Sequence, residues 1–254
     1  MKSLTKDMFN FSYENYKQLI LYSKNIAPIF RLKDFNQKKG IILRHDVDFD
    51  IKSAYNLAQI EKEMGIVSTF FISTTSPTYN PRSSINRKML SEMAQDGFEI
   101  ALHFDMMYYG NASLTVLEKK VNFESKILES IIEERIESIS LHNPSINGIF
   151  PIFKGYNNAY APEIFSNDCY ISDSRMTFND KDPYTFILKA KDTPIQVLLH
   201  PEHWSPENFT YLGFYKKFLH EFAEIIDDMM QVNSTYYREI GNASLKDLIF
   251  GEKL

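Results

Sequence analysis

Cysteine is almost absent from this chain: Cys169 is the only one among 254 residues. A single thiol excludes an internal disulfide framework and favours a reducing compartment. No apolar run approaches the roughly 18 residues that a membrane-spanning helix needs, and the N-terminal residues lack the basic-then-apolar order of a secretory signal. These absences predict a cytoplasmic protein without a transmembrane segment.

Positive charge is also in short supply. The 28 Lys and Arg residues are outnumbered by 33 Asp and Glu, which gives a formal net charge of -5. No basic field for nucleic acid is therefore expected. No glycine-rich phosphate loop follows the first predicted strand, which argues against nucleotide binding. The composition, 44% hydrophobic and 24% charged, is that of a globular protein with a large core; it does not indicate an oligomeric state.

Apolar strands and amphipathic helices alternate along the chain. Strands are predicted at 39–47, 66–73, 98–104, 137–145, 169–175 and 193–204. Helices are predicted at 12–25, 48–65, 86–97, 113–137 and 161–168, and from 205 or 206 to about 232. This alternation, with near-continuous apolar strands, predicts a mostly parallel sheet covered by helices.

No low-complexity linker interrupts the series, so we expect one domain over residues 1–254. It would comprise an N-terminal helical extension (1–39), a motif-bearing barrel (40–204) and a C-terminal helical part (205–254).

Ionisable residues fall at the ends of five predicted strands. In chain order they are Asp46, Asp48, His103, His142, Asp173 and His200. The carboxyl ends of parallel strands converge on one face of such folds, where active sites are built. We therefore expect these side chains to share one site. A barrel, rather than an open sheet, would bring them together.

Neighbouring polar residues have simpler interpretations. Asp50 is expected to cap the helix that follows it. Strand alternation places Arg44, Asp46 and Asp48 on one face and His45 on the other. His45 is therefore expected to be a hydrogen-bonded packing residue rather than a ligand.

The order of short motifs from Gly40 to Trp204 resembles the polysaccharide deacetylases, the NodB-homology group of carbohydrate esterase family 4. The matching stretches are "DVD" at 46–48, "TFF" at 69–71, "EIALH" at 99–103, "LHNPS" at 141–145, "ISDSR" at 171–175 and "LLH" at 198–200. The resemblance implies a distorted (β/α) barrel that binds a divalent metal and hydrolyses the N-acetyl group of an amino sugar. By position, it implies that Asp46 is the general base, that Asp48 and His103 are metal ligands, and that His200 is the general acid, tuned by Asp173.

Two departures from the family pattern fall at the implied metal site. Met107 stands where the second ligand histidine belongs, and a thioether is a poor zinc ligand. His142 replaces the arginine of the family's R-x-P loop. We expect His142 to supply the missing imidazole, with Asp105 as the alternative, and Arg175 to replace the lost arginine beside Asp46.

The predicted function is a metal-dependent hydrolase that removes the N-acetyl group from an amino sugar in surface-glycan metabolism, on a nucleotide- or lipid-linked precursor. Zinc is the expected metal, although two imidazoles and a carboxylate also suit iron, cobalt or nickel. Further substrate contacts are expected from the Ser145 backbone, from Leu199 together with Leu198, and from His203 and Trp204.

Two alternatives remain open at the level of sequence. One is a non-catalytic barrel of the same fold that binds a metal or a carbohydrate, which Met107 favours. The other is a related C–N hydrolase that acts on a non-sugar amide. Retention of Asp46, Asp173 and His200 favours an enzyme, because binding alone requires neither an acid nor a base.

Overall fold

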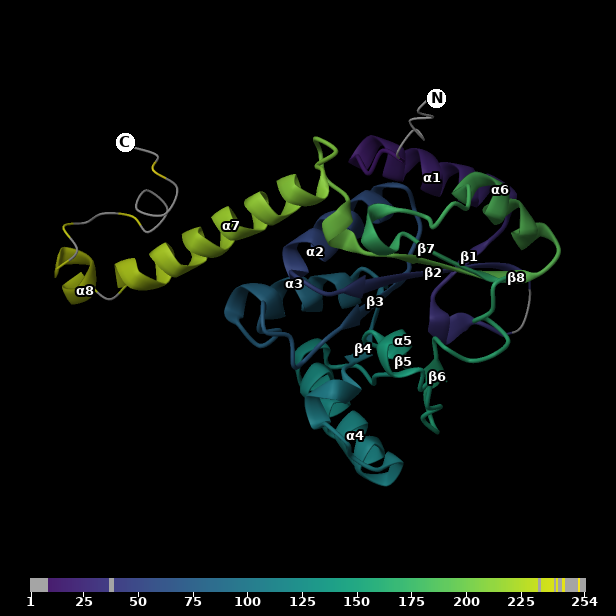
Figure 1. The fold of residues 1–254 in the computed structure, drawn as a ribbon, viewed down its shortest axis with the longest axis horizontal. Coiled ribbons are helices and arrows are strands. Elements are labelled where there is room, and N and C mark those ends of the chain that lie inside the picture. The colour runs from purple at the N-terminus through teal and green to yellow at the C-terminus, as the bar shows by residue number, and fades with distance from the viewer. Residues whose placement is uncertain are drawn as a thin grey trace, which may run out of the picture. The chain divides into compact units, whose positions relative to one another are not determined.

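A curled parallel sheet forms the centre of residues 1–208, the first of two compact units in this computed structural model (Figure 1). The structure describes residues 9–36, 39–232, 234–239, 241, 244 and 251. The strands are β1 (Ile29–Phe30), β2 (Gly40–Val47), β3 (Thr69–Ile72), β4 (Glu99–Phe104), β5 (Ser138–Leu141), β6 (Asn157–Asn158), β7 (Tyr170–Ser172) and β8 (Pro194–Leu199).

All strand pairings among the described residues are parallel. The order across the sheet is β6-β5-β4-β3-β2-β8-β7, and β1 pairs with the start of β2. The register sets Asp46 opposite Phe71 of β3 and Arg44 opposite Leu198 of β8. The predicted fold class, a mostly parallel α/β barrel of distorted form, is confirmed.

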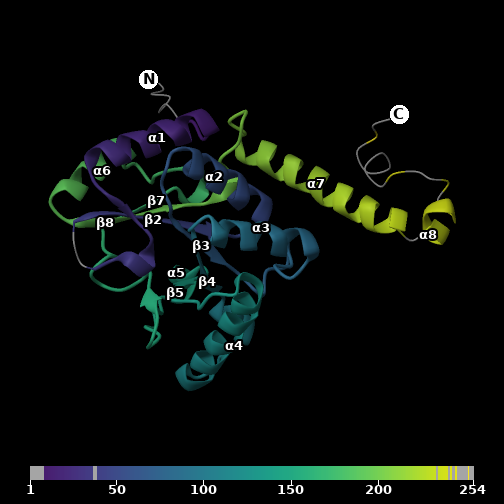
Figure 2. The same ribbon diagram turned by 180° about the vertical axis from the view of Figure 1, so that it is seen from behind.

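Helices connect the strands and cover the outer face of the sheet. They are α1 (Tyr13–Ile26), α2 (Ile51–Glu63), α3 (Ser84–Gln95), α4 (Leu114–Ile132), α5 (Pro144–Asn147) and α6 (Pro183–Ile187). Short 3-10 turns are η1 (Leu32–Asp34), η2 (Met106–Tyr109), η3 (Ser174–Met176), η4 (Leu188–Lys191) and η5 (Pro201–His203). Helices α1 and α6 lie side by side, as both views show (Figures 1 and 2).

Strand alternation divides the core into an outer and an inner part. Outward side chains of β2 and β8 pack with α1, α2 and α6, and those of β3 to β5 pack with α2, α3 and α4. On the inner face, Ile42, Phe71 and Ala101 pack against Ala159 and Ile164 of the segment after β6. This inner packing covers the inner face of the sheet below the strand C-termini, and the residues at those C-termini line a cleft.

One predicted helix is absent, and another begins later than predicted. Residues 161–168 form turns rather than a helix. The helix predicted from Ser205 or Pro206 begins at Tyr211, because Ser205 instead pairs with Ser12 in an isolated parallel bridge and Asn208 has a φ of 52°.

The second unit, residues 209–254, contains α7 (Tyr211–Val232) and α8 (Ser234–Glu239). The organisation of the whole chain as one domain stays a prediction. Among the described residues, no helix combines the length and the apolar character needed to span a bilayer.

Candidate metal and catalytic site

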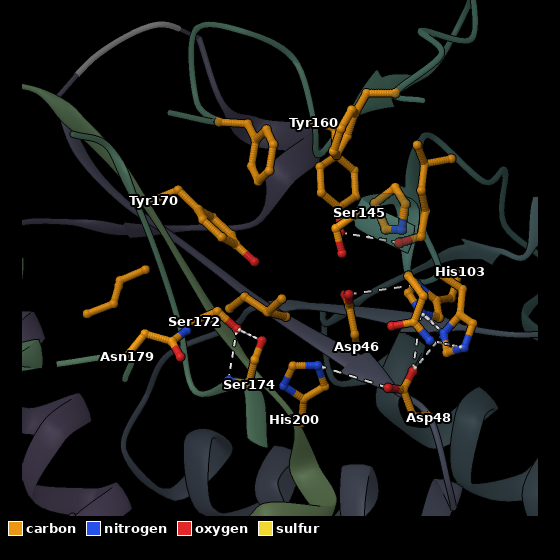
Figure 3. A pocket seen from close by; sticks show the side chains of 18 of the residues that line it. Asp46, Asp48, His103, Ser145, Tyr160, Tyr170, Ser172, Ser174, Asn179 and His200 are labelled. Carbon is orange, nitrogen blue, oxygen red and sulfur yellow. Dashed lines mark hydrogen bonds and ion pairs between the residues drawn. The ribbon is translucent and has the colours of Figure 1, made fainter. Parts of the chain in front are cut away.

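Strand β2 separates its polar side chains onto two faces. All eight of its residues are buried. On the outer face, His45 Nε2 lies 2.7 Å from Glu61 Oε1 and 3.3 Å from the hydroxyl of Tyr16. This confirms that His45 is a hydrogen-bonded packing residue. On the inner face, Asp46 points into the site (Figure 3) and Arg44 forms an ion pair with it.

A buried ion pair joins Arg44 and Asp46. The guanidinium is fully buried; its Nη2 lies 2.8 Å from Asp46 Oδ2 and its Nε lies 3.2 Å from Oδ1. The same Nη2 donates to the hydroxyls of Ser140 and Tyr160, both at 3.2 Å. Burial alone would raise the pKa of Asp46, but the charge of Arg44, followed by that of His103, holds the pKa of Asp46 below its usual range.

The expectation that Arg175 stands beside Asp46 is wrong. Arg175 is exposed in η3 with a φ of 60°, and the guanidinium that pairs with Asp46 is that of Arg44. The sequence already placed Arg44 and Asp46 on the same face of the strand. Residues i and i+2 of a strand share a face and lie close enough for a long side chain to bridge them, and that was the available signal.

Asp48, His103 and His142 converge on one point from the ends of β2, β4 and β5, and Figure 3 shows Asp48 and His103 side by side. His103 Nε2 lies 3.0 Å from His142 Nδ1 and 3.2 Å from Asp48 Oδ1, and His142 Nδ1 lies 3.3 Å from the same oxygen. Tetrahedral ligands at the usual zinc distances lie about 3.3 Å from one another. The three atoms therefore already have nearly the mutual spacing of a zinc ligand set.

The surroundings of these atoms also fit a cation. Asp48 Oδ1 is buried and accepts no hydrogen bond of regular geometry, although two imidazole nitrogens lie beside it. Burial would raise the pKa of Asp48, but the His103 and His142 contacts hold it well below the usual range. A charged carboxylate oxygen without a regular donor is costly when buried, and a divalent cation would satisfy it.

Ser140 links the histidine cluster to Asp46. Its hydroxyl lies 2.9 Å from His103 Nδ1, and 3.4 and 3.3 Å from the two carboxylate oxygens of Asp46. Because Arg44 and His103 can both donate to this oxygen, its own proton is directed toward Asp46. The tautomer of His103 that donates from Nδ1 to Ser140 would present the lone pair of Nε2 to a cation. Ser140 was not predicted, since a buried serine in a strand carries no chemical signal in sequence.

His200 faces the cluster from β8, backed by Asp173. The predicted pair is present, since His200 Nδ1 lies 2.6 Å from Asp173 Oδ1. His200 Nε2 lies 4.0 Å from Asp48 Oδ2 (Figure 3). Burial would lower the pKa of His200, but the Asp173 charge and hydrogen bond outweigh it and raise this pKa to about 10. His200 is therefore protonated at neutral pH.

His203 and Trp204 contact the second carboxylate oxygen of Asp173, the one that His200 Nδ1 does not approach most closely. Trp204 Nε1 donates to Asp173 Oδ2 at 3.1 Å, and His203 Nδ1 lies 3.4 Å from the same oxygen. Both side chains are buried and neither lines the cleft. The expectation that they contact substrate is therefore wrong; they hold the carboxylate that supports His200.

A cleft of about 390 Å³ opens over these groups. Besides Asp46, Asp48, His103, His142 and His200, its lining includes Ser145, Tyr160, Phe165, Tyr170, Asn179, Lys181 and Leu198. Ser145 therefore lines the cleft, and its contact with substrate stays a prediction. Leu199 does not line the cleft: it is fully buried in the outer core, because it follows Leu198 in the strand and so points to the opposite face.

Asp105 and Met107, the other two residues considered as metal ligands near His103, lie outside the cluster. Asp105 is the N-cap of η2, and its Oδ1 accepts a hydrogen bond from the Met107 backbone N–H at 2.8 Å. The Met107 side chain is half-exposed. The described residues contain two groups of three possible metal ligands. The group around His103 includes His142 and not Asp105, and the other consists of Asp173, His200 and His203.

The fold and the site thus define a parallel α/β protein with an Asp–His–His cluster at the C-terminal edge of its sheet. No protein-family model matches the sequence, and no curated protein matches it. Several solved structures resemble it at 13–17% sequence identity.

One of these structures is a mutant, with restored enzymatic activity, of a carbohydrate esterase family 4 pseudoenzyme from Bacillus anthracis. Its identity is 13%, its TM-score is 0.44, and the match covers 74% of this chain and 63% of that one. The present chain therefore spans less than two thirds of that protein.

Two others carry the same family number. The family 4 domain of a multidomain xylanase from the hindgut metagenome of Trinervitermes trinervoides has 17% identity and a TM-score of 0.43, with 82% and 95% of the two chains covered. A family 4 carbohydrate esterase from Bacillus anthracis has 16% identity and a TM-score of 0.41, with 89% and 90% covered.

Proposed function

We propose that this protein is a metal-dependent hydrolase that removes the N-acetyl group from an amino sugar in surface-glycan metabolism. The observation that supports it most is the convergence of Asp48 Oδ1, His103 Nε2 and His142 Nδ1 to within 3.0–3.3 Å of one another, inside a cleft that also holds Asp46 and His200. A cation site flanked by a carboxylate and a protonated imidazole suits amide hydrolysis.

Asp48, His103 and His142 would hold the metal, for which we propose zinc. Their two imidazoles and one carboxylate would also suit iron, cobalt or nickel. A metal held there would supply Lewis acidity, for lowering the pKa of a water molecule and for polarising the acetamide carbonyl.

Asp46 is the residue that takes the proton of the attacking water. Its carboxylate is charged at neutral pH because Arg44 lowers its pKa. Arg44 and Ser140 fix its orientation through the contacts described above. A base held by neighbouring groups in this way needs little reorganisation when the reaction occurs.

His200 is the residue that protonates the leaving amine. Its Nδ1 is bound to Asp173, so the proton on Nε2 is the one directed to the cleft. The backbone N–H of Ser145, in the opposite wall of the cleft, stays a predicted partner for the oxyanion.

The experiment that tests this proposal is acetate release from N-acetylglucosamine oligomers by the zinc-loaded protein. We expect release that is abolished by chelation, restored by zinc, and reduced at least about a hundredfold in His200→Ala, since general acid catalysis contributes about 10²–10⁴-fold. Absence of acetate release from every N-acetylated sugar offered would contradict the proposal.

The non-catalytic alternative rests on Met107 and makes a different prediction in the same experiment. A binding barrel would bind zinc and the oligomers but release no acetate. Release of acetate from a simple acetanilide, with none from sugars, would instead favour the non-sugar C–N hydrolase.

A further inference from the structure

An aromatic wall runs along the cleft away from the histidine cluster. It consists of Phe150, Tyr160, Phe165 and Tyr170, all of which line the cleft. The ring centroids of Tyr160 and Phe165 are 4.7 Å apart, and those of Phe165 and Tyr170 are 4.8 Å apart, both in edge-to-face contact. Phe150 continues the wall, 5.6 Å from Tyr160 and 5.5 Å from Phe165.

The Tyr160 ring anchors this wall to the catalytic centre. It covers the Arg44 guanidinium at 4.9 Å, and its hydroxyl accepts from Arg44 and donates to the Leu141 carbonyl. The polar end of Tyr160 is therefore occupied inside the protein. The Tyr170 hydroxyl points into the cleft (Figure 3), whereas Phe150 and Phe165 present only hydrocarbon to it.

An apolar rim adjoins the wall at Phe150, which belongs to both, and its isoleucines lie outside the lining of the cleft. It consists of Ile146, Ile149, Phe150 and Ile152, which are 74%, 60%, 37% and 46% exposed. The rim follows Ser145, itself a lining residue of the cleft. Residues 143–153 contain no charged side chain.

The chemistry of the rim fits a hydrocarbon chain better than a further sugar ring. Isoleucine offers neither a flat π face for stacking nor a polar atom for hydroxyl groups. Three exposed isoleucines within seven residues are unfavourable in water unless a ligand or partner covers them. The lack of Lys and Arg in this stretch also disfavours docking on an anionic bilayer, which attracts basic segments.

We propose that the substrate is an amphiphile, an N-acetylated amino sugar that carries a lipid chain, with the chain lying along the aromatic wall and over the apolar rim. This inference rests on the proposed function, since it assigns a substrate class to the same cleft. The sugar occupies the end of the cleft near Asp46 and His200, and the chain leaves past Phe150.

The test compares two probes that differ only in their chain, the methyl and octyl β-glycosides of N-acetylglucosamine, below the micelle concentration of the octyl compound. Calorimetry with the zinc-loaded full chain gives Kd for each, and acetate release is measured in parallel. We expect the octyl glycoside to bind at least about tenfold more tightly, because each buried methylene contributes favourably.

The rim variant Ile146→Ser/Ile149→Ser should bring the two Kd values to within about twofold and leave that of the methyl glycoside unchanged. Ile85→Ser is the matched control: Ile85 lies in α3, is 71% exposed and is not part of the cleft, so the octyl preference should persist. Both rim positions are exposed, so the variants are expected to fold.

Equal Kd values in the wild type, or an octyl preference that survives in the rim variant, would overturn the inference. So would rim-dependent binding to phosphatidylglycerol vesicles without an octyl preference, because the rim would then meet a bilayer. If both glycosides lose acetate at equal rates and bind equally, the inference fails and the proposed function stands. If the octyl compound binds more tightly and neither loses acetate, the chain site stands and the hydrolase proposal fails.

Discussion

The charge of Asp46 depends on Arg44, two positions earlier in the same strand. Both side chains are buried, and the guanidinium also contacts Ser140 and Tyr160. A buried carboxylate that loses its cationic partner pays the cost of desolvation without compensation. The ion pair therefore affects stability as well as catalysis.

We expect Arg44→Met to lower the free energy of unfolding by about 3–5 kcal/mol at pH 7, measured by urea denaturation. The control is Lys62→Met, which removes the half-exposed partner of Asp96 and should cost at most about 1 kcal/mol. Because the folded-state pKa of Asp46 is lowered, the stability that this carboxylate contributes is present above the unfolded pKa and is lost as the pH falls. The effect of Arg44→Met should therefore shrink toward low pH; equal effects of the two variants would contradict this account.

The charge of His200 depends on Asp173 in the same way. The carboxylate raises the pKa of His200 to about 10, so the acid form should persist until the pH approaches that value. In Asp173→Asn this support is lost and burial lowers the pKa of the imidazole. We expect the alkaline limb of kcat against pH to move to lower pH in this variant. An unchanged alkaline limb, with kcat merely reduced, would show that His200 is not the titrating acid.

At the scale of elements, Asp50 connects the site strand to α2. Its Oδ1 accepts from the Ser53 backbone N–H, as the cap predicted from sequence. We expect Asp50→Ala to cost about 1 kcal/mol in thermal or urea unfolding. Ser113 precedes α4 without a side-chain cap hydrogen bond, so Ser113→Ala should cost clearly less. A larger loss at Ser113 than at Asp50 would contradict the assignment.

The periodicity of the sequence predicted the elements that carry the site. The apolar runs gave β2, β4, β5 and β8, and their ends placed Asp46, Asp48, His103, His142 and His200 on one edge of the sheet. The two-residue strands β1 and β6 were not predicted, because so short a strand leaves no alternation to detect.

The errors at the site came from direction and tertiary packing. Leu199 was misplaced although strand alternation would have separated it from Leu198. The contacts of His203 and Trp204 with Asp173 depend on η5. This turn follows β8 and brings both side chains back to the Asp173 carboxylate. Such a return is decided by packing between segments distant in sequence, and no local pattern encodes it.

At the scale of the whole molecule, metal binding should stabilise the fold. Asp48, His103 and His142 come from β2, β4 and β5 or the residues just after them, so one cation would tie three strands together. At zinc concentrations about a hundredfold above Kd, linkage adds about 2.7 kcal/mol to the free energy of unfolding. We expect chelation to lower the Tm of the wild type and to leave that of His142→Ala unchanged. A Tm insensitive to zinc in both would contradict this expectation.

The central proposal is that His142 completes a metal site in which Met107 stands where the polysaccharide deacetylases that the sequence resembles have their second ligand histidine. The most direct measurement is the metal content of purified, zinc-equilibrated wild type, His142→Ala and Asp105→Ala, determined by mass spectrometry after dialysis. We predict about one zinc per chain in the wild type and in Asp105→Ala, and a large loss in His142→Ala, since catalytic zinc sites use three protein ligands. Full zinc content in His142→Ala, or no divalent metal in the wild type, would contradict the account.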